Sequence, residues 1–446
     1  MIFLHLWQSF VFFLLPLSEK EMGRLKSYIM LAVLLTTCFT ESLSANTVLY
    51  TSSLFKGRTL NVQKLNAYIS KFKGNKIVFD RDYVLSSSET SDVKKVVYDG
   101  ILVKSGIAYV GNGHTLSFGN SSNIFNTMND EHNQAIVKGF SISGFKFKRD
   151  RRDTVSIRYQ GATLLLGRVS DCRITNCTFD RWKGTAISIA FIYDSKMSKH
   201  ILGYSKNVLI RDCVLNGGSN YNSGNGINVI SGENDRIANC KFSNINPSVW
   251  PGPIDLETEV EGSSLDKIYV DSCDFTNVGR LAPVSLAGKG SNPNGTVYIT
   301  NCNVSGAQMA VSVAGSPCDS VFVSNMKANG LLRFATIANT SVNVSISGSN
   351  FTAASNMLSN DNVIQASSGK VVIDDCVFRG FRGTIDGWGS VSFVVSANSV
   401  SLTGNEFYDC YDKKGNPIGI AVNKQRGKTV NISAKDNVYT GGVAVK

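Results

Sequence analysis

The chain has 446 residues, of which 43% are hydrophobic and 18% charged, with 40 glycines and 8 prolines. Lysine and arginine number 45 and aspartate and glutamate 34, so the formal net charge is +11. This composition is too apolar and too weakly charged for a disordered chain. Because one ordinary hydrophobic core stops growing at roughly 250–300 residues, the length predicts either several domains or one architecture that grows by stacking repeats.

The N-terminal region has the features of a secretion signal. Arg24 and Lys26 form a positive segment, the apolar run 28–35 follows it, and small residues follow at 42–45. This is the order of a secretory signal peptide, so we expect Met22 to be the true start and cleavage to fall in the group of small residues. No later run approaches the ~20 apolar residues of a membrane span. We expect a secreted, periplasmic or cell-surface protein without a transmembrane anchor.

A short pattern recurs through the rest of the chain: an apolar residue, two polar or small residues, a core position, one free residue, and an aromatic or aliphatic residue. Its clearest copies have cysteine at the core position and are 174–179, 210–215, 237–242, 270–275, 299–304 and 373–378. Weaker copies place there Phe145, Met326, Ser349, Asn405 and Lys435. The core positions run from 145 to 435 in ten steps, a mean period of about 29 residues.

A period of this length, made of short strands and turns, predicts an all-β fold: a single-stranded right-handed parallel β-helix of about eleven or more coils. A propeller blade needs about 40–45 residues, and leucine-rich repeats have a tighter period. Asparagine or aspartate precedes most core positions. Both residue types tolerate the left-handed backbone that a sharp bend between strands requires.

Apolar residues at helical spacing predict an amphipathic helix that ends at Gly74-Asn75. These residues are Val62, Leu65, Ile69 and Phe72. We expect this helix to cap the first coil, whose edge would otherwise pair with another chain. The predicted organisation is therefore an N-terminal extension and signal at 1–44, a segment with the capping helix at 45–75, and the β-helix at 76–446.

With this repeat and cap, residues 60–446 resemble the pectate-lyase-like (pectin lyase fold) right-handed β-helix superfamily, which includes secreted polysaccharide-degrading enzymes and phage tailspikes. The resemblance implies a groove that binds glycans. It does not define the activity, because the superfamily uses one scaffold for many substrates. The sequence lacks the NTD, DD, GHG and RIK set of polygalacturonases and the calcium-aspartate cluster with RxPxxR of pectate lyases, which argues against both families.

Nine cysteines follow the signal, and six of them share the core position. An odd number cannot all pair within one chain, and parallel stacked side chains point the wrong way for a disulfide. We expect an inward-pointing stack of buried free thiols and no metal–thiolate site.

The alternating segment ahead of each cysteine motif is the expected groove strand, with Ile, Val and Leu inside and the other residues outside. The first outward column is Ser188, Asn228, Asp255, Ser285 and Ser312. The second is Ala190, Ile230, Glu257, Ala287 and Ala314. Only the coil of Asp255 and Glu257 places two carboxylates side by side on this face.

Asp255 and Glu257 are two residues apart on one strand, so their Cα atoms are expected about 6.5–7 Å apart. This spacing suits an inverting glycosidase, with room for a water between acid and base. A carboxyl group near another tends to have a raised pKa, as a general acid requires. The segment 252–257 also resembles the GIDIEP-type signature of the superfamily, with Thr258 where that pattern has proline. Glycoside hydrolysis by this pair is the leading prediction.

Seven further residues are predicted to bind substrate. Trp250 and Tyr221 are candidate stacking platforms for sugar rings, and Asn228 shares the outward column of Asp255. Four cations flank the groove, where they can neutralise a uronate or supply the base of a lyase. These are Arg181, Lys183, Arg280 and Lys289.

Several alternatives stay open. The carboxylate pair can be a solvated surface pair, or can hold a structural calcium ion with Glu259, Glu261 or Glu233; no other cofactor is expected. The protein can instead be a polysaccharide lyase, a non-catalytic adhesin or tailspike-like rod, or a structural cell-envelope protein. The expected partner is a polysaccharide, and the net charge suits an acidic one. No motif predicts nucleic-acid binding.

Overall fold

The structure is a computed structural model. It describes residues 47–86, 99–119, 123–127, 135–149, 162–182, 184–194, 199–217, 224–245, 252–260, 262–279, 282–288, 295–338, 341–355, 365–366, 369–381, 394–395, 399–410 and 431–441. The predicted signal peptide lies outside these ranges. Within them, no helix has the length and apolar character needed to cross a membrane. The chain divides into two compact units, Met1–Leu49 with Lys73–Lys76, and Tyr50–Phe72 with Ile77–Lys446.

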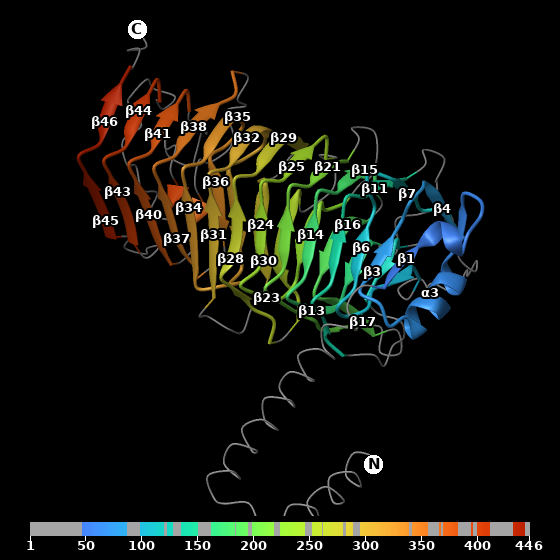
Figure 1. The fold of residues 1–446 in the computed structure, drawn as a ribbon. Helices are drawn as coiled ribbons and strands as arrows, with labels where there is room; N and C mark the ends of the chain where they lie inside the picture. The colour runs from blue at the N-terminus through green and yellow to red at the C-terminus, as the bar shows by residue number, and fades with distance from the viewer. Residues whose placement is uncertain are drawn as a thin grey trace, which may run out of the picture. The chain divides into compact units, whose positions relative to one another are not determined.

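The larger unit is a right-handed parallel β-helix, as the repeat predicts. Four consecutive strands belong to four different sheets: β13 (Arg168–Ser170), β14 (Arg173–Thr175), β15 (Thr178–Asp180) and β16 (Thr185–Ile189). Each of them pairs in parallel with strands of the coils before and after it. The coils therefore follow one another in sequence order along the stack (Figure 1).

We name the sheets A to D. Within the larger unit, sheet A continues from β3 (Lys76–Val78) through β6 (Ala108–Val110), β10 (Ser141–Ser143), β14, β20 (Leu209–Arg211), β24 (Arg236–Ala238), β28 (Ile268–Asp271), β31 (Thr296–Thr300), β34 (Ser320–Ser324), β37 (Asn343–Ser347), β40 (Lys370–Asp374) and β43 (Ser399–Thr403) to β45 (Asn431–Lys435). β1 (Val48–Tyr50) and the 3-10 helix η1 (Thr51–Ser53) precede it in the chain.

Sheet B follows sheet A in every coil. Its strands are β2 (Thr59–Asn61), β4 (Tyr83–Ser86), β7 (Thr115–Ser117), β11 (Lys146–Lys148), β15, β21 (Val214–Asn216), β25 (Lys241–Ser243), β29 (Asp274–Gly279), β32 (Asn303–Ala307), β35 (Lys327–Leu331), β38 (Asn350–Ala353), β41 (Val377–Arg379), β44 (Glu406–Tyr408) and β46 (Val438–Thr440).

Sheet C contains the expected groove strands. Its order is β5 (Ile101–Leu102), β8 (Phe125–Asn126), β12 (Ala162–Leu166), β16, β22 (Ile227–Val229), β26 (Ile254–Thr258), β30 (Val284–Gly288), β33 (Val311–Ala314) and β36 (Ala335–Ala338). Sheet D is shorter and consists of β9 (Val137–Lys138), β13, β19 (Tyr204–Lys206), β23 (Gly232–Glu233) and β27 (Leu265–Asp266). Two separate pairs are β17 (Phe191–Asp194) with β18 (Lys199–Leu202) and β39 (Gln365–Ala366) with β42 (Val394–Val395).

The predicted capping helix is α3 (Val62–Lys71), which buries the predicted apolar face and ends at the extended Phe72, before Gly74. The Asn61 side chain caps its first turn by accepting from the Lys64 amide. Asn66 binds the edge strand β5: its amide donates to the Gly100 carbonyl at 2.9 Å, and its oxygen accepts from the Leu102 amide at 2.8 Å. One side chain thus occupies backbone groups that a further strand would use.

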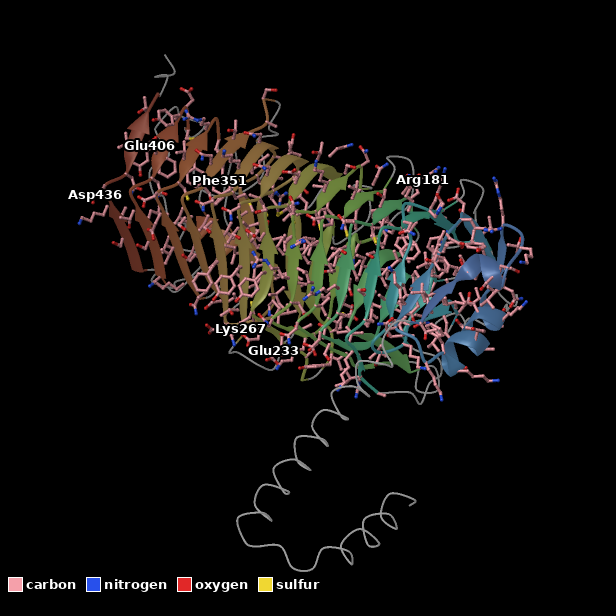
Figure 2. The ribbon with its side chains drawn as sticks, in the orientation of Figure 1. Arg181, Glu233, Lys267, Phe351, Glu406 and Asp436 are labelled. Atoms are coloured by element: carbon pink, nitrogen blue, oxygen red, sulfur yellow. The ribbon has the colours of Figure 1, made fainter. Side chains whose placement is uncertain are left out.

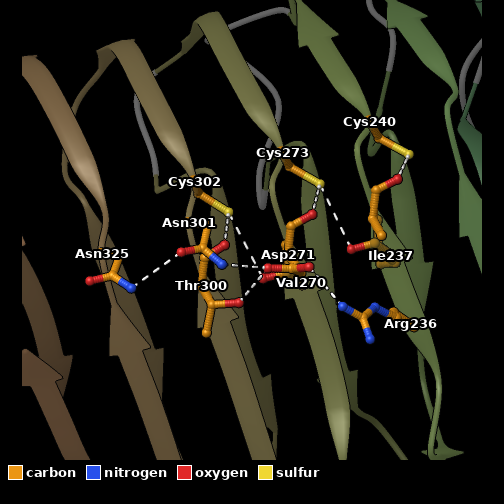
Figure 3. Close-up of polar contacts among 11 residues, drawn as sticks. Arg236, Ile237, Cys240, Val270, Asp271, Cys273, Thr300, Asn301, Cys302 and Asn325 are labelled. Carbon is orange, nitrogen blue, oxygen red and sulfur yellow. Dashed lines mark hydrogen bonds and ion pairs between the residues drawn. The ribbon is translucent and has the colours of Figure 1, made fainter.

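The nine cysteines of the described chain are all free and buried, which confirms the predicted thiol stack. Each thiol of the stack lies against backbone carbonyls of its own coil and of the preceding coil. The Sγ of Cys273, for example, is 3.4 Å from the carbonyl oxygen of Asp271 and 3.8 Å from that of Ile237 (Figure 3).

The bends ahead of the core positions adopt the predicted left-handed backbone. Asn176, Asn239, Asn301 and Asp375 have φ angles of 54°, 52°, 55° and 50°. Their polar side chains also connect the coils. Asn301 donates to Asp271 at 2.9 Å and accepts from Asn325 at 3.2 Å (Figure 3).

The weak copy placed at Lys435 is wrong by two residues. Lys435 pairs with Thr403, two positions ahead of the core position Asn405. The core position of this coil is Asn437, whose side-chain oxygen accepts from the Asn405 amide at 3.0 Å. Asp436, with φ 57°, supplies the left-handed bend. The error has a physical cause: Ala434, which pairs with Leu402, stands where the other copies begin with a large apolar residue, so the pattern does not identify this copy.

Candidate carboxylate site on sheet C

The predicted first column is present in sheet C. Backbone pairing aligns Ser188 with Asn228, Asn228 with Asp255, Asp255 with Ser285, and Ser285 with Ser312. The alternating apolar residues lie on the core side, as Ile254 and Leu256 on β26 are both 0% exposed. Period-two alternation therefore predicts which residues share this column.

The column is not solvent-exposed, however, which corrects the expectation of an open face. Asp255 and Ser285 are each 1% exposed, and Asn228 is 8% exposed. For Asp255 this rules out a solvated surface residue. Burying a carboxyl group is costly unless it is hydrogen-bonded or protonated, so its contacts decide its chemistry.

Two side-chain amides converge on one oxygen of Asp255. Asn225, just ahead of β22, and Asn228 within it each donate Nδ2–H to Oδ2 of Asp255 at 2.9 Å. The other carboxyl oxygen, Oδ1, is buried and has no hydrogen-bond partner among the described residues. The Asn225 Oδ1 is in the same situation. Asp255 and Asn225 are thus joined by one hydrogen bond, and each has a second side-chain oxygen that is buried without a partner among the described residues.

These surroundings raise the pKa of Asp255 to about 8. Burial is the largest cause, and the negative charge of Glu257 acts in the same direction. The hydrogen bonds from Asn228 and Asn225 oppose it, because they stabilise the carboxylate. Asp255 is therefore mostly protonated at neutral pH.

Glu257 is half-buried on the same strand, and burial followed by the negative charge of Glu259 raises its pKa. Its column is shorter than predicted. Glu257 pairs with Ala287, whereas Ala190 and Ile230 lie just beyond the ends of β16 and β22. The site therefore combines a buried, protonated carboxyl group with a second one that is less enclosed.

The remaining predicted binding residues divide into two groups. Arg181 forms an ion pair with Asp180 at 3.0 Å, and its side chain is 14% exposed. Its guanidinium therefore has a carboxylate partner already. The other five lie outside the described residues; they are Trp250, Tyr221, Lys183, Arg280 and Lys289.

The carboxylates proposed as calcium ligands are not assembled in the described part of the chain. No group of three or more His, Cys, Asp or Glu side chains suited to a metal ion occurs there. Glu233 instead accepts from Lys206 at 2.6 Å in sheet D. Figure 2 shows Glu233 and Arg181 on opposite sides of the stack. Glu261 lies outside the described residues.

Asn225 is a site residue that the sequence pattern did not identify. It precedes β22 and so falls outside the alternation that defines the column. Its side chain reaches across to the next coil, a contact for which the strand period gives no signal.

No protein-family model matches the sequence, and no curated protein matches it. Solved β-helix structures do match. The tailspike protein of E. coli bacteriophage HK620 in complex with a pentasaccharide has a TM-score of 0.54 at 13% identity, over 86% of this chain and 77% of that chain. A mutant of this tailspike in complex with a hexasaccharide has a TM-score of 0.55, also at 13% identity and with the same coverage. PfbA, a surface adhesin of Streptococcus pneumoniae, has a TM-score of 0.50 at 13% identity, over 85% of this chain and 87% of that chain. These similarities establish the fold.

Proposed function

We propose that this β-helix is an exported glycan-binding protein that hydrolyses its polysaccharide, with Asp255 as general acid and Glu257 as general base. The protonated state of Asp255 carries the proposal. A general acid must hold its proton at the working pH, and burial beside a second carboxyl group raises the pKa of Asp255 to about 8. The saccharide-bound tailspike that shares the fold supports a glycan as the substrate class.

The reaction is a single displacement. Asp255 gives its proton to the glycosidic oxygen as the bond from that oxygen to the anomeric carbon breaks. Glu257 takes a proton from a water molecule, whose oxygen bonds to the same carbon from the opposite face. One water is consumed, and the two carboxyl groups exchange protons with solvent to return to their starting states. The less enclosed Glu257 is the member of the pair expected to ionise first.

A second candidate function is glycan binding without cleavage. The observation that favours it is the 1% exposure of Asp255, which places the acid away from the accessible surface. The fold shared with a surface adhesin is compatible with such a role.

A panel of capsular and plant polysaccharides tests these functions. Hydrolysis produces new reducing ends without the ultraviolet absorbance of an unsaturated uronide, and a lyase produces that absorbance. Asp255→Asn and Glu257→Gln are each expected to lower kcat by about 10²–10⁴-fold. The anomer released first, followed by NMR, should be inverted.

Ser312→Ala is the matched control, because Ser312 occupies the same buried column without contacting Asp255. It should retain full activity. Hydrolysis that survives both carboxyl substitutions would refute the site, and retention on a glycan without cleavage would establish the binding function instead.

A further inference from the structure

We infer that Asn225 and Asn228 are positioning residues that occupy Oδ2 of Asp255 and so hold its acidic proton on Oδ1. This inference rests on the proposed function and deepens it. The sequence pattern predicts Asn228 as a substrate ligand; its contacts give it a different role.

The two asparagines determine which oxygen of Asp255 can hold the proton. An amide N–H only donates, so both asparagines must find a lone pair on Oδ2. Two donors at one carboxyl oxygen leave the proton of the neutral acid to the other oxygen. Oδ1 is that oxygen, and it has no partner among the described residues. The proton of the neutral acid is thus placed on the one carboxyl oxygen that the two asparagines leave unpaired.

The charges around Asp255 favour its neutral form. The groups that act on it are Glu257 on its own strand, Glu259 beyond that strand, and the two amides from the preceding coil; Ser285 is its neighbour in the following coil. Among the described residues, no cation is one of the groups that act on Asp255 to stabilise its ionised form. Glu257 is only half-buried on the same strand, so burial disfavours its charge less, and it is the group that ionises and accepts a proton from water.

Removing an amide and removing the charge of Glu257 should shift the pKa of Asp255 in opposite directions. The amides stabilise ionised Asp255, so removing one raises its pKa. Glu257 disfavours ionised Asp255, so removing its charge lowers that pKa. Each amide is therefore expected to shift the titration midpoint by about one to two pH units, because a hydrogen bond to a charged group is stronger than one to a neutral group.

Difference infrared spectroscopy measures this midpoint without substrate. The carbonyl band that is present in the wild-type protein and absent from Asp255→Asn reports the protonated acid as the pH is raised. We expect a midpoint near pH 8. The midpoint should be higher in Asn225→Ala and Asn228→Ser and lower in Glu257→Gln. Serine at 228 matches Ser188 and Ser285 of the same column, which keeps that variant compatible with the fold.

Kinetics distinguish a positioning residue from a substrate ligand. Asn228→Ser should lower kcat by about tenfold, which equals about 1.4 kcal/mol, move the alkaline limb of kcat/KM upward, and leave KM unchanged. Ser312→Ala should match the wild type in every measurement. Midpoints that do not move in the asparagine variants, or a raised KM at unchanged kcat, would overturn the inference. The infrared midpoints remain informative if no glycan is cleaved, so failure of the proposed function is distinguishable from failure of this inference.

Discussion

The hydroxyl of Ser205 is hydrogen-bonded to Oδ2 of Asp235, and both side chains are buried, at 0% and 3% exposure. Ser205 Oγ also lies 2.8 Å from the carbonyl oxygen of Ser231. A hydroxyl has one proton to donate, so both contacts are satisfied when Asp235 is protonated and donates to Ser205, which then donates to Ser231. Burial, the largest cause, raises the pKa of Asp235 to about 7.

We predict that Asp235 makes the protein less stable as the pH rises from about 4 to 7. Its pKa is higher in the folded chain than in the unfolded one, where it is near 3.8. The folded state therefore binds this proton more tightly, and the resulting stability is present at low pH and lost as the pH passes the folded pKa. The contribution changes by at most about 1.4 kcal/mol per pH unit.

Urea unfolding of the wild type and Asp235→Asn across this pH range tests the prediction. The free-energy difference between the two proteins isolates Asp235, because other titrating groups are common to both. The free energy of unfolding of the wild type, relative to that of Asp235→Asn, should decline as the pH rises. A difference in unfolding free energy that stays constant across this pH range would contradict the raised pKa of Asp235.

The second prediction concerns the buried thiols. In the chain from residue 45 on, all nine cysteines are expected to be inert to a thiol reagent such as DTNB while the protein is folded. All nine are buried, so the reagent does not reach them in the folded protein. For Cys410, Cys318 and Cys376 burial also raises the pKa, to about 11 for the first and about 12 for the other two, which disfavours the reactive thiolate. Titration at pH 8 should give less than one reactive thiol, and unfolding in guanidinium should release the rest. Rapid modification of several thiols in the folded protein would contradict the closed stack.

The third prediction concerns the cap. Asn66→Ala leaves the Gly100 carbonyl and the Leu102 amide without their side-chain partner, at a cost of about 1–3 kcal/mol for each group that stays buried. Asn61→Ala removes only the helix N-cap and should cost about 1 kcal/mol. Chemical denaturation compares the two variants. Equal losses would show that Asn66 does not protect the edge of β5.

The stacking of successive coils could be predicted from the sequence. The chemistry of the candidate site could be predicted only in part. The spacing of Cys273 and Cys302 defines a coil, because a strand partner must recur at each turn. The column of Asn228 and Asp255 follows from alternation alone. Their burial does not follow from it. Alternation distinguishes the core side of a strand from its outer side, but it does not show what covers the outer side.

The sequence pattern missed the core position of the last described coil and a side-chain contact between two coils. Asn437 fills the core position of its coil with an amide that donates to the Leu402 carbonyl at 2.9 Å. The pattern missed it because Ala434 stands three residues before it, where Leu402 stands before Asn405. Asn225 reaches Asp255 from outside a strand, so its role depends on the path of the loop. Tertiary geometry, and not local pattern, determines both.

The last prediction separates backbone strain from hydrogen bonding in the bends. Asn301 has φ 55° and bonds to Asp271 and Asn325. Asn301→Gly removes only the bonds, since glycine tolerates this backbone. Asn301→Ala also adds the left-handed strain of about 1–2 kcal/mol and should be less stable than the glycine variant by that amount.

Asn303→Ala is the matched control, because Asn303 lies in β32 and bonds to Asp274 of the preceding coil at 2.8 Å. It should lose about 0.5–1.5 kcal/mol. Denaturant unfolding measures all three, and equal stability of the alanine and glycine variants at 301 would refute the role of the left-handed bend.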